Sequence, residues 1–331
     1  MDINWSSLLG HDKQISQLRQ MLDEHRMPHA LLFSGAEGIG KRRIAEVLAA
    51  ALLCSGEDSP CGHCESCRAL MRDGHPDYHL LEPEAAGKAV PSIRIEQLRA
   101  MQTEIARLPL ISGCRVVIID QADRMNEVAE NSLLKTLEEP VGETYFILVT
   151  HARSSLLDTI RSRCIPISFG MLSAEVVQIA LEKRGVLPEQ ARELAALSDG
   201  SLGHAIRLYE KNGLELREDA LTFLETIGKL SPEQIFSKGK DFDGMPKEQL
   251  LEWLGYQCSL LRDILVLYQD GGSEEIYHLD VRERLLRLLT CFSESRVFRM
   301  LSLVRETQRR LQANVNLRLL MEGMLLRWRR T

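Results

Sequence analysis

Residues 30–42 read Ala-Leu-Leu-Phe-Ser-Gly-Ala-Glu-Gly-Ile-Gly-Lys-Arg, and this stretch decides the fold. A short apolar run leads into a glycine-rich loop, and the Ala- and Leu-rich stretch 44–53 that follows is typical of a helix. A strand, a G-x4-G-K loop and a helix in this order indicate a phosphate-binding loop, because glycines let backbone N–H groups turn towards a phosphate. The helix N-terminus adds positive potential, and a lysine reaches the outer phosphates. The candidate phosphate-binding residues are Gly35, Gly38, Gly40 and Lys41.

The loop departs from the usual pattern at its last position. A serine or threonine normally follows the lysine, and its hydroxyl ligates Mg²⁺. Arg42 holds that position here, and a guanidinium has no lone pair to offer a cation. We therefore expect a loop that keeps its phosphate-binding shape, leaves ATP or ADP binding open and lacks a functional Mg²⁺ site. A glycine-rich turn without any ligand is the alternative, and the arginine favours it.

A second nucleotide-binding motif follows the apolar run 115–119. Asp120 ends this predicted strand, where a carboxylate would orient a Mg²⁺-bound water. ATPases of this class usually place a glutamate next, as the base for the attacking water, but the residue here is Gln121, whose amide cannot accept a proton. Asp123 is expected to cap a helix. The departures at Arg42 and Gln121 together predict a chain that hydrolyses ATP very weakly or not at all.

The first half of the chain alternates predicted strands with predicted helices. Strands are expected at 30–33, 78–81, 115–119, 145–149 and 165–169, and helices at 44–53, 93–108, 126–137 and 156–161. Such alternation predicts a mostly parallel α/β sheet covered by helices, with Pro166 weakening the last strand. From Ser173 onward only helices are predicted, and the last, at 295–328, is expected to break near residues 314–316.

Length and composition bound the class of protein. The chain has 331 residues, of which 44% are hydrophobic and 27% charged, and its net charge is −6. These values are ordinary for a globular protein of two or three domains. No apolar run approaches the roughly 18–20 residues of a membrane helix, and residues 1–5 lack the layout of a signal peptide. We therefore expect a cytoplasmic protein that makes no membrane contact and does not bind nucleic acid by bulk charge.

The eight cysteines divide into a cluster and four single residues. The cluster has the spacing C-x6-C-x2-C-x2-C and consists of Cys54, Cys61, Cys64 and Cys67. In a reducing compartment clustered cysteines are metal or redox sites rather than disulfides. Four thiolates close a tetrahedral shell, which predicts one structural zinc per chain, with His63 as a spare ligand. An iron–sulfur cluster and a redox pair are the alternatives.

Several motifs in this order resemble the AAA+ clamp-loader family. They are the phosphate loop, the four cysteines directly after its helix, Asp-Gln-Ala-Asp at 120–123, Asn-Ser-Leu-Leu-Lys-Thr-Leu-Glu-Glu-Pro at 131–140 and Ile-Arg-Ser-Arg-Cys at 160–164. The phosphate loop alone is shared by many unrelated NTPases. The leucine-rich string and the Ser-Arg-Cys tripeptide, found together, are specific.

The resemblance implies three domains and a place in a ring. An α/β (RecA-like) P-loop domain with the inserted zinc module at 54–67 would span 1–169, a helical lid 170–212 and a helical collar that oligomerises 213–331. The implied partners are the gamma/tau and delta subunits of a hetero-pentameric ring in the bacterial DNA polymerase III holoenzyme. The ring loads the sliding clamp onto primed DNA during replication, so clamp and DNA are partners through the complex.

The resemblance also assigns roles to single residues. Arg163, with Ser162 and Cys164, would be an arginine finger that reaches a neighbour's ATP, an effect worth about 10³–10⁵ in rate. An exposed arginine at a helix end is the alternative. Active relatives carry an arginine at the position of Gly203, and they keep a polar sensor at that of Thr150.

These motifs leave three functions open. The favoured one is a non-hydrolysing clamp-loader subunit that acts as a scaffold and lends an arginine finger to a gamma/tau ATP site. The second is an active clamp-loader ATPase of the gamma/tau kind. The third is a zinc-dependent DNA-binding module, which the net charge of −6 disfavours.

Overall fold

The computed structural model describes residues 3–84, 91–210, 213–273, 276–311 and 316–330. The chain forms two compact units. The first, which we call the α/β unit, contains residues 1–188 and 198–204, and the second, the helical unit, contains residues 189–197 and 205–331. The division falls inside the stretch 170–212, so the separate lid domain stays a prediction.

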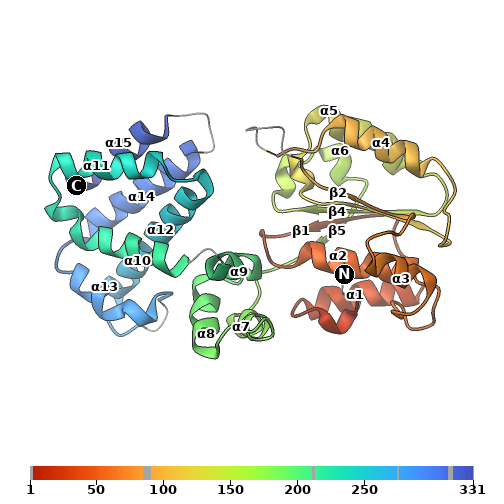
Figure 1. Cartoon of the computed structure of the whole chain (residues 1–331), viewed down its shortest axis with the longest axis horizontal. Helices are drawn as coiled ribbons and strands as arrows, with labels where there is room; N and C mark the ends of the chain where they lie inside the picture. The colour runs from red at the N-terminus through yellow and green to blue at the C-terminus, as the bar shows by residue number, and fades with distance from the viewer. Residues whose placement is uncertain (1–2, 85–90, 211–212, 274–275, 312–315, 331) are drawn as a thin grey trace. The chain divides into compact units, whose positions relative to one another are not determined.

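A five-stranded, wholly parallel sheet forms the centre of the α/β unit (Figure 1). Its strands are β1 (Ala30–Ser34), β2 (Tyr78–Leu81), β3 (Arg115–Ile119), β4 (Thr144–Thr150) and β5 (Ile165–Ser168), in the order β2-β3-β4-β1-β5. The predicted mostly parallel α/β sheet is thus confirmed. Pro166 lies in β5, at an edge of the sheet, where a residue without an N–H group is tolerated.

Helices cover both faces of this sheet (Figure 1). One face packs against α1 (Asp12–Asp23), α2 (Lys41–Leu53) and α3 (Glu65–Met71), and the other against α4 (Ile95–Ile105), α5 (Glu127–Glu138) and α6 (Asp158–Arg161). Alternate side chains of β1 serve the two cores, since Leu31 and Phe33 lie in one and Leu32 in the other. Burial on both faces explains why the strands read as continuous apolar runs.

Some predicted helices have different bounds in the structure. The stretch 93–108 is helical only as far as Ile105, because the buried Arg115 guanidinium binds the carbonyls of Ile105 at 2.7 Å and Arg107 at 2.8 Å. Helix α13 spans only seven residues, Arg282–Leu288. Helices α1 and α3 were not predicted.

After β5 the described residues form helices joined by turns and loops, as predicted. Its helices are α7 (Ala174–Glu182), α8 (Pro188–Leu197), α9 (Leu202–Glu210), α10 (Gly213–Thr226), α11 (Pro232–Asp243), α12 (Lys247–Gln269), α13, α14 (Glu294–Leu311) and α15 (Leu317–Arg330). Short 3-10 helices lie at Trp5–Ser7, Ala122–Arg124, Arg153–Ser155, Ile227–Lys229 and Leu279–Val281. Helix α14 ends at Leu311 and α15 begins at Leu317, and the break expected near 314–316 falls mostly on residues 312–315, which lie outside the described part.

An aromatic cluster anchors the core of the helical unit. The Trp253 ring lies 4.8 Å from that of Phe242 and 5.5 Å from that of Phe223, and Trp328 is fully buried beside them. These rings join α10, α11, α12 and α15. Across the described residues, no helix is both long and apolar enough to cross a bilayer.

Candidate functional site

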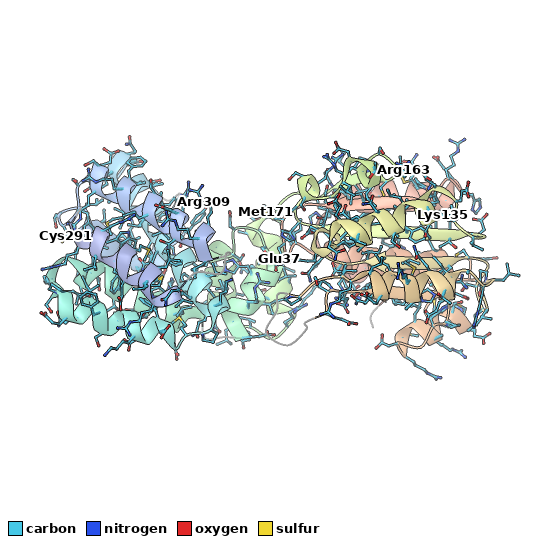
Figure 2. The ribbon with its side chains drawn as sticks, turned by 90° about the horizontal axis from the view of Figure 1, so that it is seen from above. Glu37, Lys135, Arg163, Met171, Cys291 and Arg309 are labelled. Atoms are coloured by element: carbon cyan, nitrogen blue, oxygen red, sulfur yellow. The ribbon has the colours of Figure 1, made fainter. Side chains whose placement is uncertain are left out.

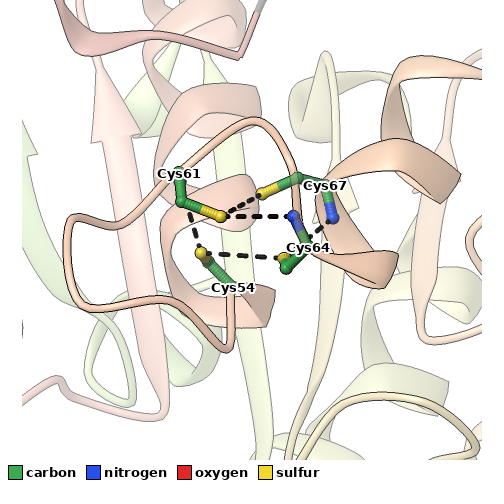
Figure 3. A group of neighbouring side chains, drawn as sticks. All are labelled: Cys54, Cys61, Cys64 and Cys67. Carbon is green, nitrogen blue, oxygen red and sulfur yellow. Dashed lines mark hydrogen bonds between the residues drawn. The ribbon is translucent and has the colours of Figure 1, made fainter.

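The four clustered cysteines converge on one point (Figure 3). All four sulfur atoms lie within 4.8 Å of one another. The Sγ atoms of Cys54 and Cys64 are 3.9 Å apart, and those of Cys61 and Cys67 are 4.0 Å apart. A tetrahedral site with Zn–S distances of about 2.3 Å requires sulfur–sulfur separations of about 3.8 Å. The cysteine geometry therefore fits a closed four-sulfur metal site.

Backbone N–H groups that donate to the sulfur atoms favour the thiolate form and lower the pKa of the Cys61 and Cys64 thiols, whereas burial raises the pKa of the Cys54 and Cys67 thiols. Cys54 Sγ accepts from the N–H groups of Gly56 and Cys61, both at 3.3 Å, and Cys64 Sγ accepts from Cys67 at 3.4 Å. Burial opposes ionisation of Cys64, but the N–H groups of Cys67 and Ser55 outweigh it and lower the pKa of its thiol to about 6. Hydrogen bonds of this kind orient and stabilise metal-bound thiolates.

The cysteine module is tied to the core of the α/β unit. Cys67 is fully buried in that core, on α3, and the Trp5 indole donates to the Ser59 carbonyl at 3.1 Å. His63 is exposed, and its Nδ1 lies 2.8 Å from the Cys61 carbonyl, so it is outside the four-sulfur group. A closed, packed shell suits a structural rather than a catalytic role.

The nucleotide-binding motifs gather at one edge of the sheet. The phosphate loop follows β1, Asp120 follows β3, and Thr150 ends β4. Because the strands are parallel, their carboxyl ends lie at the same edge, which is where open α/β sheets bind ligands. The structure therefore brings these sequence-predicted residues together.

The phosphate loop turns sharply between β1 and α2. Gly35, Gly38 and Gly40 have φ values of 151°, 76° and 99°, in the region that favours glycine. The beginning of α9 packs directly on the loop, where Ser201 Oγ donates to the Glu37 carbonyl at 2.8 Å and the Gly203 N–H donates to the Gly38 carbonyl at 2.7 Å.

Lys41 is buried against its own loop. Its Nζ donates to the carbonyls of Gly35 at 2.8 Å and Ala36 at 2.5 Å. Burial lowers the pKa of this ammonium, an effect that the charges of Asp120 and Glu37 oppose. The lysine thus closes the loop on itself.

Arg42 lies on the Asp120 carboxylate. Its Nη1 is 3.4 Å from Asp120 Oδ2 and also contacts Glu82, and its Nε donates to Glu46 Oε1 at 3.0 Å. Burial raises the pKa of Asp120, while the Arg42 charge opposes that shift. The guanidinium therefore lies where a cation bound to Asp120 would lie.

The remaining polar groups at this edge bond to one another. Thr150 Oγ1 donates to Asp123 Oδ1 at 2.6 Å, and His151 Nδ1 lies 3.1 Å from the other Asp123 oxygen. The expectation that Asp123 caps a helix is wrong, because Asn126 caps α5 by accepting from Ala129. Gln121 has a φ of 49° directly after β3.

Arg163 lies at the surface of the α/β unit, just after α6 (Figure 2). Its Nε donates to Glu138 Oε1 at 2.8 Å, its Nη2 contacts the same oxygen, and its Nη1 donates to the Thr159 carbonyl at 2.9 Å. About a third of the side chain is exposed. Ser162 is exposed, whereas Cys164 is buried in the core, which raises the pKa of its thiol to about 12.

Sequence reasoning missed four residues that complete these arrangements. They are Glu46 and Glu82 beside Arg42, Ser201 above the phosphate loop and Glu138 beside Arg163. The spacing of four residues between Arg42 and Glu46 is a helical ion-pair signal that was available. The other three contacts join segments far apart in sequence, so no local pattern announces them.

A parallel sheet with a phosphate loop after β1, a carboxylate after β3 and a polar residue ending β4 defines a P-loop protein of the AAA+ (RecA-like) class. Family models described as "DNA polymerase III, delta subunit" and "DNA polymerase III, delta subunit, C terminal" match residues 10–173 and 211–330. The chain belongs to the DNA polymerase III delta-prime family.

Two relatives similar in sequence agree with this assignment. The chain is 35% identical to the DNA polymerase III subunit delta' of Pseudomonas aeruginosa, over 91% of each chain. It is 30% identical to the subunit delta' of Bacillus subtilis, over 98% of each chain. Among solved structures, a DNA polymerase III gamma subunit-related protein of Thermotoga maritima matches 96% of this chain and 99% of its own, at 18% identity and a TM-score of 0.46.

Proposed function

We propose that this chain is a clamp-loader subunit that does not hydrolyse ATP and that lends Arg163 to a neighbouring ATP site. Its ring neighbours would be gamma/tau and delta subunits, which would load the sliding clamp onto primed DNA in the cytoplasm. Similarity to tau subunits of Salmonella typhimurium and Escherichia coli, at 32% identity over 62% of this chain, supports an assembly of related subunits.

The observation that carries this proposal is the contact between Arg42 and Asp120. A guanidinium lies on the carboxylate that would hold Mg²⁺, and Gln121 replaces the base. Hydrolysis needs both the ion and a group that positions or deprotonates water. Loss of both leaves the fold of an ATPase without its chemistry.

Arg163 supports the second half of the proposal. Its guanidinium lies at the surface, and among the described residues its hydrogen bonds go to Glu138, Thr159 and Ser162 and to none of the phosphate loop. An ion pair between two part-exposed side chains contributes at most about 1 kcal/mol. A neighbour's triphosphate, with its higher charge, would readily compete for this arginine.

The cysteine module would hold a structural zinc. All four sulfurs lie within 4.8 Å of one another, which supports one four-ligand zinc site over a redox pair, since a redox pair needs only two thiols. The metal would stabilise the fold and take no part in ATP chemistry.

Reconstituted rings test the arginine. Replacing Arg163 by alanine should leave this chain folded and lower ATP hydrolysis by the ring by about 10³-fold or more at the neighbouring site. The matched control is Arg161→Ala, two residues earlier, where the side chain pairs with Asp158. If the ring hydrolyses ATP equally well with the Arg163 variant, Arg163 is not an arginine finger. If the isolated chain hydrolyses ATP and Lys41→Ala abolishes that activity, the chain is an active ATPase.

A further inference from the structure

The residues beside the phosphate loop do not fit Mg²⁺. A loop that uses this ion needs a hydroxyl after the lysine and a free carboxylate at the strand end. Here the Arg42 guanidinium contacts the carboxylates of Asp120, Glu82 and Glu46. The guanidinium, which is always charged, thus contacts three carboxylates and lies where Mg²⁺ would bind.

The parts of the loop that bind phosphate remain available. Within the described residues, the backbone N–H groups of Gly38, Ile39 and Gly40 donate to no protein acceptor. These groups precede the 13-residue helix α2, whose N-terminus attracts anions. Lys41 Nζ has three hydrogens, of which two are taken by loop carbonyls, so one is left for a ligand.

Packing of α9 on the loop does not use those groups. Ser201 and Gly203 donate to the carbonyl oxygens of Glu37 and Gly38. Phosphates bind to N–H groups instead. The α9 contact and a bound phosphate therefore do not compete for the same atoms.

We propose that Arg42 replaces the divalent cation and that the loop binds the phosphate chain of a nucleoside diphosphate or triphosphate without Mg²⁺. The Nη2 atom of Arg42 donates to no acceptor among the described residues, and its side chain is 39% exposed, so it can donate to a phosphate oxygen. Removing the guanidinium leaves three carboxylates facing the phosphates, a repulsion that only another cation compensates.

Equilibrium binding to the full-length chain tests this replacement. Titration calorimetry with ADP and with ATP is done twice, in excess EDTA and in millimolar Mg²⁺. The wild-type chain should bind equally under both conditions, within about twofold. The nucleotide affinity of the Arg42→Ala variant should be at least about tenfold lower than that of the wild type in EDTA, which is the effect of one charged hydrogen bond. In Mg²⁺ this affinity should return to the wild-type value.

Two further variants keep the result interpretable. Arg43→Ala is the matched control, because this neighbouring arginine contacts Glu46 and Ser7 rather than Asp120. Arg42→Thr, which restores a hydroxyl, should bind in Mg²⁺ and weakly in EDTA. Circular dichroism checks that each variant is folded.

Three outcomes would overturn the proposal: a wild-type chain that needs Mg²⁺, one that binds neither nucleotide at millimolar concentration, or an Arg42→Ala variant that binds like the wild type in EDTA. The binding measurement involves neither the ring nor Arg163. A negative binding result would therefore not contradict the proposed arginine finger. A negative result for the finger would likewise not contradict nucleotide binding without Mg²⁺.

Discussion

A single methyl group at Gly203 should separate α9 from the phosphate loop. A Cβ atom built on Gly203 would lie 2.8 Å from Gly38 Cα and 3.3 Å from its carbonyl oxygen. Both are backbone atoms, which cannot rotate away as a flexible side chain does. The Gly203→Ala variant must therefore lengthen or lose the 2.7 Å hydrogen bond from the Gly203 N–H to the Gly38 carbonyl.

The change in the local opening free energy is the sum of two destabilising contributions and one stabilising contribution. Overpacking in a close contact costs about 1–3 kcal/mol. A lost hydrogen bond adds about 0.5–1.5 kcal/mol. Alanine is favoured over glycine inside a helix by about 0.5–1 kcal/mol, which offsets part of this cost. The local opening free energy should fall by about 2 kcal/mol, which raises amide exchange about 30-fold.

Hydrogen exchange read by mass spectrometry measures this change. Peptides covering 35–41 and 198–204 should exchange faster in Gly203→Ala than in the wild type. The matched control is Gly255→Ala in α12, where no atom of another described segment lies within 4 Å of the added Cβ, so the helix should become slightly more stable. The reasoning would be refuted if both peptides of the Gly203→Ala variant exchanged at the wild-type rate. It would also be refuted if Gly255→Ala raised the exchange rate by the same factor.

Three other predictions concern the metal, the finger and acid stability. Purified protein should contain about one zinc per chain and Cys64→Ser much less; elemental analysis that finds iron or no metal would contradict this. Glu138→Ala should change ring ATP hydrolysis by no more than about fivefold, the value of an exposed ion pair, while Arg163→Ala abolishes the finger; equal losses would instead make Glu138 essential for positioning. Burial opposes ionisation of Asp77, but N–H bonds from Ser112, Ile111 and Leu110 outweigh it and lower its pKa. Its stabilising effect should therefore be complete above the unfolded pKa of about 3.9 and lost as pH falls through the folded pKa. Asp77→Asn should flatten that part of the acid unfolding profile, and an unchanged profile would assign it to other groups.

Local sequence patterns predict many of the strands and helices correctly. Strands β2 and β3 have the predicted bounds, because short apolar runs flanked by polar residues are strong signals for buried strands. Helix α5 begins after Asn126, whose side chain caps it, and ends before Pro140. Helix α4 ended early for a reason outside its own sequence, since Arg115 binds the carbonyls that follow it.

The candidate sites divide in the same way. Spacing alone located the four cysteines and the phosphate loop, because their ligand groups are close in sequence. The partners of Arg42 and Arg163 were not predicted, because Glu82 and Glu138 reach them across the fold. The sequence predicts a helix cap at Asp123, but its carboxylate accepts a hydrogen bond from Thr150 on a neighbouring strand.

The sequence by itself determined the P-loop fold class, the cysteine cluster and the loss of the hydroxyl and the base at Arg42 and Gln121. Each depends on residue types at fixed local spacing, which short-range backbone geometry converts into structure. Only the tertiary structure decided that the guanidinium of Arg42 lies on Asp120 and that Gly203 packs on Gly38. Those contacts arise when parallel strands bring distant loops to one sheet edge, so their chemistry depends on distances that the sequence does not contain.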